Sequence, residues 1–499
     1  MERNFTMDKK GFDNNKYLEM QSAKILERIS TFGDKLYLEF GGKLFDDYHA
    51  SRVLPGFEPD SKIKMLSQLK DQAEILIVIN ANDIEKNKQR SDLGITYDVE
   101  VLRLIDIFVD KGFYVGSVVL TRFAEQSSAI AFQKRLEMRG IRVYRHFPIV
   151  GYPSEVEKIV SEEGYGKNEY VVTTRPLVVV TAPGPGSGKM ATCLSQLYHE
   201  NKRGVKAGYA KYETFPVWNL PLNHPVNVAY EAATADLNDM NMIDPFHLEA
   251  YGERAVNYNR DVEIFPVLSA MLEKVLGKCP YKSPTDMGVN MAGYCIVDND
   301  VVLKASKQEI IRRYYSALLE VRKGKIGKEV ISKLEILMQR MQISITDRDV
   351  VKPALEKENL TGQPAVAMQL NDGTLVTGKT GNLLGASAAA LLNALKVLAN
   401  IDDSVDIISS KVIEPIQKLK VNHMGSVNPR LHTDEVLISL AVSAATDKTA
   451  MKALEQLNKL KGAQLHSSVI LSSVDDKTLK KLGIDVTCEP KRKTERNFN

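Results

Sequence analysis

Short apolar runs alternate with longer amphipathic stretches along the first part of the chain. Strands are predicted at Lys35–Phe40, Glu74–Asn80, Phe113–Thr121 and Ile141–His146, with helices at Tyr97–Lys111 and Glu125–Gly140. Period-two and continuous apolar runs are typical of strands, whereas apolar residues at intervals of three and four indicate helices. Strands that alternate with helices predict an α/β fold with a Rossmann-like parallel sheet.

The middle of the chain begins with another strand, loop, helix and strand at Pro176–Pro216. The alternation then stops. Glu231–Lys278 is predicted to be mainly helical, and Ser306–Arg340 to be a long helical stretch interrupted near Gly324–Gly327. We interpret this part as a P-loop-like α/β unit with a helical middle subdomain.

The last part again mixes strands and helices. Asn371–Asp372–Gly373 between two apolar runs predicts a β-hairpin. The strands are predicted at Ala365–Gln369, Leu375–Thr377, Val405–Ser409, Ala463–Leu471 and Ile484–Thr487, and the helices at Leu384–Ala399, Asp434–Ala445, Lys448–Gly462 and Asp475–Gly483. The predicted domains are therefore 1–170 (Rossmann-like), 171–345 (P-loop-like with a helical insertion) and 346–490 (C-terminal α/β), followed by a basic tail at 491–499.

Composition narrows the classes of partner. The 499 residues are 44% hydrophobic and 26% charged with a net charge of +3, so charge gives no reason to expect nucleic-acid binding. The four cysteines include no C-x-x-C pair, as is usual in a reducing cytoplasm. No apolar run approaches 18 residues. We expect a cytoplasmic protein that binds neither nucleic acid nor membrane.

The segment Thr181–Thr192, TAPGPGSGKMAT, joins a predicted strand to a predicted helix. Glycines allow backbone to approach an anion, and the unpaired N–H groups at a helix start attract it. The predicted anion-binding residues are Gly184, Gly186, Ser187, Gly188 and Lys189. This stretch predicts a site for a phosphorylated small molecule.

The loop departs from the P-loop pattern G-x-x-x-x-G-K-[ST] at two positions. Pro183 stands where the first glycine belongs, and Met190 stands where a hydroxyl would hold magnesium. ATP, or another nucleotide, with Mg²⁺ is therefore one alternative among several ligands.

Lys211 ends the strand after the loop helix. Over about forty residues this arrangement resembles the dethiobiotin synthetase and cobyric acid synthase branch of P-loop proteins. The resemblance implies that Lys211 lies beside the phosphates.

Polar side chains are dense between Asn223 and His247. Asp236 and Asp239, on one face of a predicted helix, are candidate Mg²⁺ ligands, and His224 or His247 is a candidate general base.

Further candidates for substrate binding follow predicted strands or lie in a polar loop of the C-terminal part. They are Gly41, Gly42, Lys43, Asn80, Asn82, Asp83, His423 and Arg430. If the first two strands are parallel neighbours, the residues after them share one edge of the sheet.

Four long segments resemble one bacterial family, catalogued as domain of unknown function 1846. They are KLYLEFGGKLFDDYHASRVLPGFEPDSKIKML, TAPGPGSGKMATCLSQLYHE, NHPVNVAYEAATADLNDMNMIDPFH and GASAAALLNALKVLA. The resemblance implies a fold but no reaction, so no site residue is taken from it.

Three functions remain open. The first is ATP-dependent transfer or ligation on a phosphorylated substrate. The second is an ATP-independent enzyme for a sugar phosphate or carboxylate, and the third is a non-catalytic metabolite-binding or assembly protein. The Ala/Leu-rich and charged helices of the second half are candidates for a subunit contact in a homo-oligomer.

Overall fold

The computed structural model describes residues 10–33, 35–42, 44–45, 47–90 and 94–492. These residues divide into two compact units, one spanning Lys10–Ser306 and the other beginning at Lys307. Each unit has its own sheet and is described by itself.

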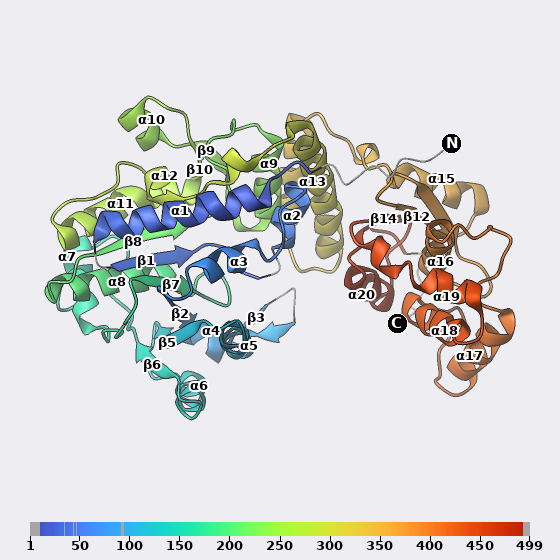
Figure 1. Ribbon diagram of the computed structural model, residues 1–499, viewed down its shortest axis with the longest axis horizontal. Helices are drawn as coiled ribbons and strands as arrows, with labels where there is room; N and C mark the ends of the chain where they lie inside the picture. Colours follow the sequence, from blue (N-terminus) through green and yellow to red (C-terminus); the bar gives the residue numbers. More distant parts are fainter. Residues whose placement is uncertain (1–9, 34, 43, 46, 91–93, 493–499) are drawn as a thin grey trace. The chain divides into compact units, whose positions relative to one another are not determined.

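A seven-stranded parallel sheet forms the centre of the first unit. Its strands are ordered β11-β8-β1-β7-β2-β5-β6 (Figure 1). Their bounds are β1 Lys35–Phe40, β2 Ala73–Asn80, β5 Tyr114–Thr121, β6 Arg142–Arg145, β7 Leu177–Thr181, β8 Ala207–Tyr212 and β11 Gly288–Val289. The Rossmann-like α/β fold predicted from the alternating pattern is confirmed.

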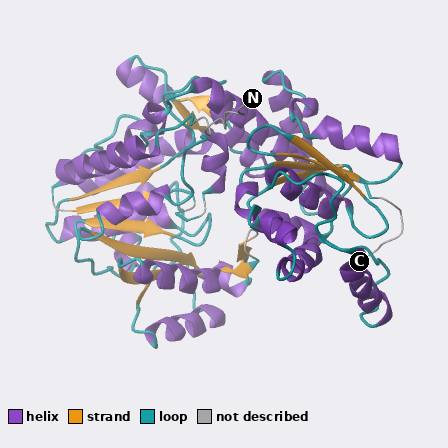
Figure 2. Ribbon diagram, turned by 45° about the vertical axis from the view of Figure 1, so that its right-hand side comes forward, coloured by secondary structure: helices purple, strands orange, loops and turns teal. Residues whose placement is uncertain are grey.

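Helices cover both faces of this sheet (Figure 2). One face buries side chains against α1 (Asn14–Phe32), α3 (Ser61–Gln68), α5 (Tyr97–Asp110) and α6 (Ser127–Glu137). The other packs on α8 (Lys189–Lys202) and α11 (Asn259–Leu276). The strand β7 is buried throughout because both of its faces lie against helices, which explains its continuous apolar sequence.

Strand β7 lies between β1 and β2. Val180 of β7 is opposite Glu39 of β1 and Leu76 of β2. The condition that β1 and β2 are direct neighbours is therefore not met, although both strands end at the same edge. The segments 1–170 and 171–345 contribute strands to one common sheet.

The stretch after β8 is less helical than predicted. Strands β9 (Asn241–Ile243) and β10 (Val256–Tyr258) form an antiparallel pair within it. Other elements of this unit are α2 Tyr48–Val53, α4 Ala81–Glu85, β3 Gln89–Arg90, β4 Ile95–Thr96, α7 Val156–Ile159, α9 Pro225–Ala233, α10 Pro245–Tyr251 and α12 Pro284–Met287. The predicted break near Gly324 is confirmed, since α13 covers Asn299–Arg322 and α14, which belongs to the second unit, covers Glu329–Arg340.

The second unit contains a mixed sheet ordered β13-β12-β14-β15. Its elements are α15 Val351–Thr361, β12 Ala365–Gln369, β13 Leu375–Lys379, α16 Ala386–Leu398, α17 Ser410–Asn422, α18 Thr433–Ala444, α19 Lys448–Leu454, β14 Gln464–Ser467, α20 Ser473–Lys481 and β15 Asp485–Cys488. The predicted hairpin is confirmed as the antiparallel pair β12 and β13. None of the described helices has the length and apolarity that crossing a membrane requires.

The prediction of a strand at Val405–Ser409 is wrong. Ile407 and Ile408 are buried in the core of this unit, so the apolar residues do pack inward. However, Ser409 is the N-cap of α17, and its side chain accepts a hydrogen bond from the backbone N–H of Lys411. A serine that caps a helix here starts α17 at a point where the strand was predicted to continue.

An ion pair joins the starts of α18 and α20. His432 Nδ1 lies 3.1 Å from Asp475 Oδ2. The hydrogen bond to Asp475 raises the pKa of His432. Burial works to raise the pKa of Asp475, but hydrogen bonds from His432 and from the Thr433 N–H outweigh it and lower that pKa.

This pair predicts a pH-dependent stability. The pKa of His432 is higher in the folded state than in the unfolded state, where it is about 6.5. The stabilisation from this pair is therefore complete below pH 6.5 and is lost as the pH rises through the folded pKa. When the pH is raised from 6 to 8.5, the free energy of unfolding should fall by about 0.5–1 kcal/mol more in wild type than in His432→Gln. The difference is this small because the pair is partly exposed. Thermal unfolding of the full chain at both pH values measures the difference.

The control for this experiment is His423→Gln. His423 is exposed at the end of α17, so this variant should follow the pH dependence of wild type. Equal pH dependence of His432→Gln and wild type would contradict the assignment.

Candidate functional site

The connections of the sheet reverse direction between β1 and β7. From β1 the chain continues to β2, which lies on the far side of β7. From β7 it continues through α8 to β8, which lies on the far side of β1. Where connections leave in opposite directions, a crevice opens at the carboxyl ends of the strands, and ligands of α/β proteins commonly bind there.

A cavity of about 1350 Å³ lies at this edge. Ends of β1, β7 and β8 contribute to its lining through Glu39, Thr181 and Lys211. Residues predicted from the sequence that line this one cavity are Gly41, Gly42, Asn82, Gly184, Gly186, Ser187, Gly188, Lys189, Lys211, Asp236 and Asp239.

The loop between β7 and α8 needs its glycines for backbone conformation and for space. Gly186 and Gly188 have φ values of +77° and +91°, a region that side chains disfavour. A Cβ at Gly184 would lie 2.1 Å from the Tyr97 hydroxyl oxygen. The sequence of alternating glycines therefore has a direct structural cause.

Side chains hold the carbonyl groups of this loop. Ser187 Oγ donates to the Gly184 carbonyl at 2.8 Å, and Thr121 Oγ1 donates to the Ser187 carbonyl at 2.6 Å. Asn80 Nδ2 donates to the Gly186 carbonyl at 3.4 Å. The N-cap of α8 is Gly188, which has no side chain to cap the first turn, and the N–H groups of that turn have no acceptor within the helix. Three carbonyl groups of the loop are therefore held by the protein itself.

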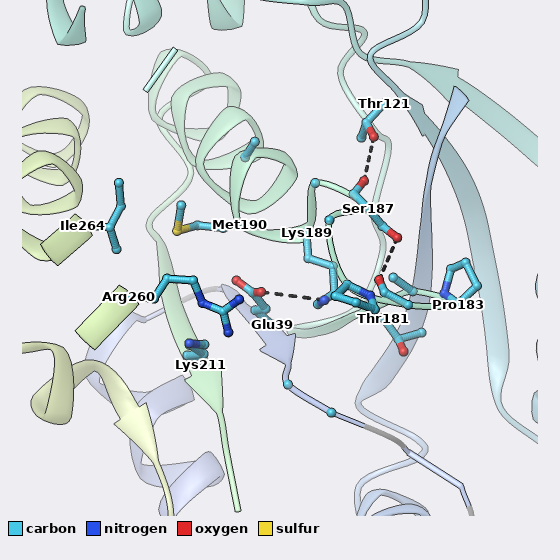
Figure 3. A pocket seen from close by; sticks show the side chains of 18 of the residues that line it. Glu39, Thr121, Thr181, Pro183, Ser187, Lys189, Met190, Lys211, Arg260 and Ile264 are labelled. Atoms are coloured by element: carbon cyan, nitrogen blue, oxygen red, sulfur yellow. Dashed lines mark hydrogen bonds and ion pairs between the residues drawn. The ribbon is translucent and has the colours of Figure 1, made fainter. Parts of the chain in front are cut away.

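Lys189 and Glu39 form a loose ion pair inside the cavity. Their charged atoms are 4.0 Å apart, and the side chains are 15% and 11% exposed (Figure 3). Tyr209 donates a hydrogen bond of 2.7 Å to the other oxygen of Glu39. Since the pair is at the limit of contact, an arriving anion can compete with Glu39 for the lysine.

Lys211 is held much more tightly. Its ammonium nitrogen contacts Asp261, Glu213 at 2.6 Å and Tyr258 Oη at 3.0 Å. An ammonium group has three protons, so these three acceptors use all of them. Burial works to lower the pKa of Lys211, but Asp261 and Glu213 outweigh it and raise that pKa. In this arrangement Lys211 lines the cavity without a donor left for a phosphate.

The residues next to this cluster differ from the predicted helix. Asp236 lies in a single turn, Ala235–Leu237, and Asn238 follows with φ of +60°, so Asp236 and Asp239 do not share a helix face. Asp239 accepts a hydrogen bond of 3.1 Å from Arg260, whereas Asp236 is exposed. Within the described ranges, no three His, Cys, Asp or Glu side chains are grouped to hold a metal ion.

Both candidate histidines lie outside the cavity lining. His224 is the N-cap of α9, and its Nε2 lies 3.0 Å from Asn299 Oδ1. Burial lowers the pKa of His224. His247 is buried in α10, with Nδ1 3.0 Å from the Ser283 hydroxyl. The structure does not bring either ring together with the glycine loop.

The remaining predicted residues that the structure describes have structural partners of their own. Asn80 caps α4, and Asp83 pairs with Lys88 at 3.2 Å. Arg430 belongs to the second unit, where its Nε donates to the Gly381 carbonyl at 2.6 Å. His423 ends α17 of that unit, and Lys43 lies outside the described residues.

Several residues of the cavity were not predicted, and the sequence gives little sign that they lie at a site. Glu39 has the clearest sign, because it lies just before the two glycines that mark a strand end. Arg260 and Tyr97 are recognisable only once α11 and α5 are placed. His146 also lines the cavity, and burial lowers its pKa to about 4, which leaves the ring neutral at neutral pH.

The fold and this altered loop define a Rossmann-like α/β protein with a glycine-rich strand-to-helix turn. The chain belongs to the family described as domain of unknown function DUF1846, whose N-terminal model matches residues 10–342 and whose C-terminal model matches residues 346–498. This bears out the family resemblance noted in the sequence.

Similar proteins are found in streptococci. The chain is 57% identical over 479 residues to a UPF0371 protein of Streptococcus pyogenes serotype M5 (strain Manfredo), covering 96% of this chain and 97% of that protein. It is also 57% identical over 484 residues to the UPF0371 protein of Streptococcus sanguinis (strain SK36), covering 97% and 98%.

The two lysines of the cavity should differ in their effect on stability. Lys211→Met leaves Asp261 and Glu213 buried without their cation, and we expect the free energy of unfolding to fall by about 3 kcal/mol. Lys189→Met removes only a loose pair and should cost about 1 kcal/mol or less. Denaturant titration of both variants measures this difference, and equal losses would contradict it.

Proposed function

We propose that the protein is an enzyme that binds a phosphorylated or nucleotide-like small molecule, with the phosphate at the Gly184–Lys189 loop. The observation that carries the proposal is the position of this loop: it lies at the switch point of a parallel sheet and opens into a large cavity. The leading candidate reaction is ATP-dependent transfer or ligation.

The donors available to a phosphate support this proposal. Three side chains hold the carbonyls of the loop, so its N–H groups and the first turn of α8 can face an anion. Lys189 is the cation at the end of this loop, and it would exchange its loose contact with Glu39 for the phosphate. Lys211 would orient the surrounding cluster and not contact the ligand itself.

Magnesium would enter together with the phosphates. Mg²⁺ is usually held by one or two carboxylates, substrate oxygens and water instead of a full protein cage. Asp236 is exposed at the cavity and could supply one carboxylate. Asp239 could do so only after its hydrogen bond with Arg260 is released.

Met190 favours a second candidate, an enzyme that acts on a sugar phosphate without ATP. Its thioether occupies the position where a hydroxyl would bind Mg²⁺, and it lines the cavity. Such an enzyme needs the phosphate site but not the magnesium hydroxyl.

Thermal shift of the full chain tests the proposal and separates the candidates. The probes are ATP with Mg²⁺, ADP, glucose 6-phosphate and glucose as the uncharged comparison. A phosphorylated probe at 100 times its Kd should stabilise the protein by about 2.7 kcal/mol. Lys189→Ala should weaken binding about 10–100-fold, because a hydrogen bond to a charged group is lost.

Lys134→Ala is the matched control, since Lys134 is exposed on α6 and does not line the cavity. It should bind like wild type. A shift with ATP and Mg²⁺ supports the first candidate, and a shift only with the sugar phosphate supports the second. The proposal fails if every phosphorylated probe binds wild type and Lys189→Ala equally.

The glycine at the helix start offers a second test. Gly188 and Gly204 flank α8, and both have positive φ, so alanine at either position should cost about 1–2 kcal/mol of stability. Only Gly188 belongs to the loop, and its Cβ would lie 3.1 Å from Thr121. Gly188→Ala should therefore weaken the phosphate probe about tenfold or more in calorimetry, whereas Gly204→Ala should leave its Kd unchanged. Equal Kd values for both variants would exclude the loop from the site.

A further inference from the structure

One face of α11 forms a wall of the cavity. Arg260, Ile264 and Leu268 all line it and are spaced four residues apart, so they lie on one side of the helix. Met190 of α8 lines the cavity as well. Figure 3 shows Met190 and Ile264 extending toward each other beside Arg260. A charged group therefore stands next to an apolar crevice.

The apolar side chains of this crevice are not fully covered by the protein. Ile264 and Met190 are only half-buried, while Leu268 is buried. Because these side chains line the cavity, an apolar group of a ligand would cover their exposed surface. Removing that apolar surface from water is favourable.

Arg260 has donors to offer. Its side chain is 57% exposed, and it donates one hydrogen bond, to Asp239. A guanidinium group has five N–H groups, and among the residues that the structure describes Asp239 is the one acceptor that Arg260 reaches. Its planar arrangement suits a carboxylate or phosphate that accepts two bonds at once.

The charges around Arg260 oppose a doubly charged anion more strongly than a singly charged one. Asp239 and Asp261 both act on Arg260 electrostatically, and Asp236 lies close enough to act on Asp239. Lys211 adds no excess positive charge, because Glu213 and Asp261 surround it. A phosphate with two negative charges would be repelled more strongly here than a carboxylate.

The size of the cavity allows more than one ligand. Sites for single small molecules usually measure about 300–1,000 Å³, and this cavity measures about 1350 Å³. We infer that its α11 side is a second subsite, which binds a carboxylate carried on an apolar chain or ring. The inference rests on the proposed function, in which the glycine loop takes the phosphate of another group or substrate.

Calorimetry with simple carboxylates tests this subsite in the full chain. The probes are octanoate and phenylacetate at millimolar concentration, each compared with its neutral amide and with octyl phosphate. At least one carboxylate should bind, and its amide should bind about tenfold more weakly or worse, since the charge-assisted bonds are lost. Arg260→Gln should weaken the carboxylate by a similar factor, and Ile264→Asn should also weaken it.

Two control variants make the result specific. Arg254→Gln removes an exposed arginine that does not line the cavity, and it should bind the carboxylate like wild type. Lys189→Ala should also bind it within about twofold, because its lysine belongs to the loop site. Circular dichroism of Arg260→Gln checks that the exposed substitution leaves the fold intact.

The subsite is overturned if neither carboxylate binds wild type, if Arg260→Gln binds as wild type does, or if octyl phosphate binds more tightly than octanoate in a manner that depends on Arg260. Phosphate probes that still depend on Lys189 would then leave the proposed function standing. Conversely, carboxylate binding that depends on Arg260, without any phosphate binding, would refute the loop proposal alone.

Discussion

The pairing of β7 between β1 and β2 is the constraint on which the site depends. Parallel strands end at a common edge, and insertion of β7 between two strands that precede it in the chain makes the connections diverge there. The loop after β7 is thereby enclosed between the residues that end β1, β2 and β5. Thr121 and Asn80, which come from two of these strands, hold its carbonyl groups. The conformation of the loop consequently depends on the whole sheet as well as on the glycines of its own sequence.

The cavity separates two roles that lysines commonly combine. Lys211 satisfies a buried group of acceptors, Asp261, Glu213 and Tyr258, whereas Lys189 is held by one distant carboxylate. A buried cation without free donors contributes to the rigidity of a site, while a loosely paired one can change partner when a ligand arrives. The difference follows from where the partners come from: Lys211 pairs with Glu213, two residues further along the chain, and with Asp261 of α11, whereas Lys189 begins α8 and lies 4.0 Å from Glu39 of β1.

Local sequence patterns predicted the elements well and their assembly only in part. The bounds of β1 agree with its apolar run because the strand is buried on both sides. The run at Val405–Ser409 is equally apolar, yet Ser409 caps a helix there. Single-strand patterns also cannot reveal that β7 separates β1 from β2, since this order depends on contacts more than a hundred residues apart. The glycine loop is a local pattern and was therefore predictable, whereas the position of Arg260 at the cavity required the placement of α11.

The two positions at which the loop departs from the P-loop pattern both affect the surface of the cavity. Pro183 and Met190 both line the cavity, so each changes the surface that a ligand meets. Pro183 offers no N–H, which removes one backbone donor from the loop. Met190 replaces a polar ligand for a cation by a flexible apolar group that faces Ile264 across the crevice (Figure 3). The side chain that stands at the position of the P-loop hydroxyl therefore also forms part of the apolar wall beside Arg260. These two effects are linked because one side chain of α8 contributes to both parts of the cavity.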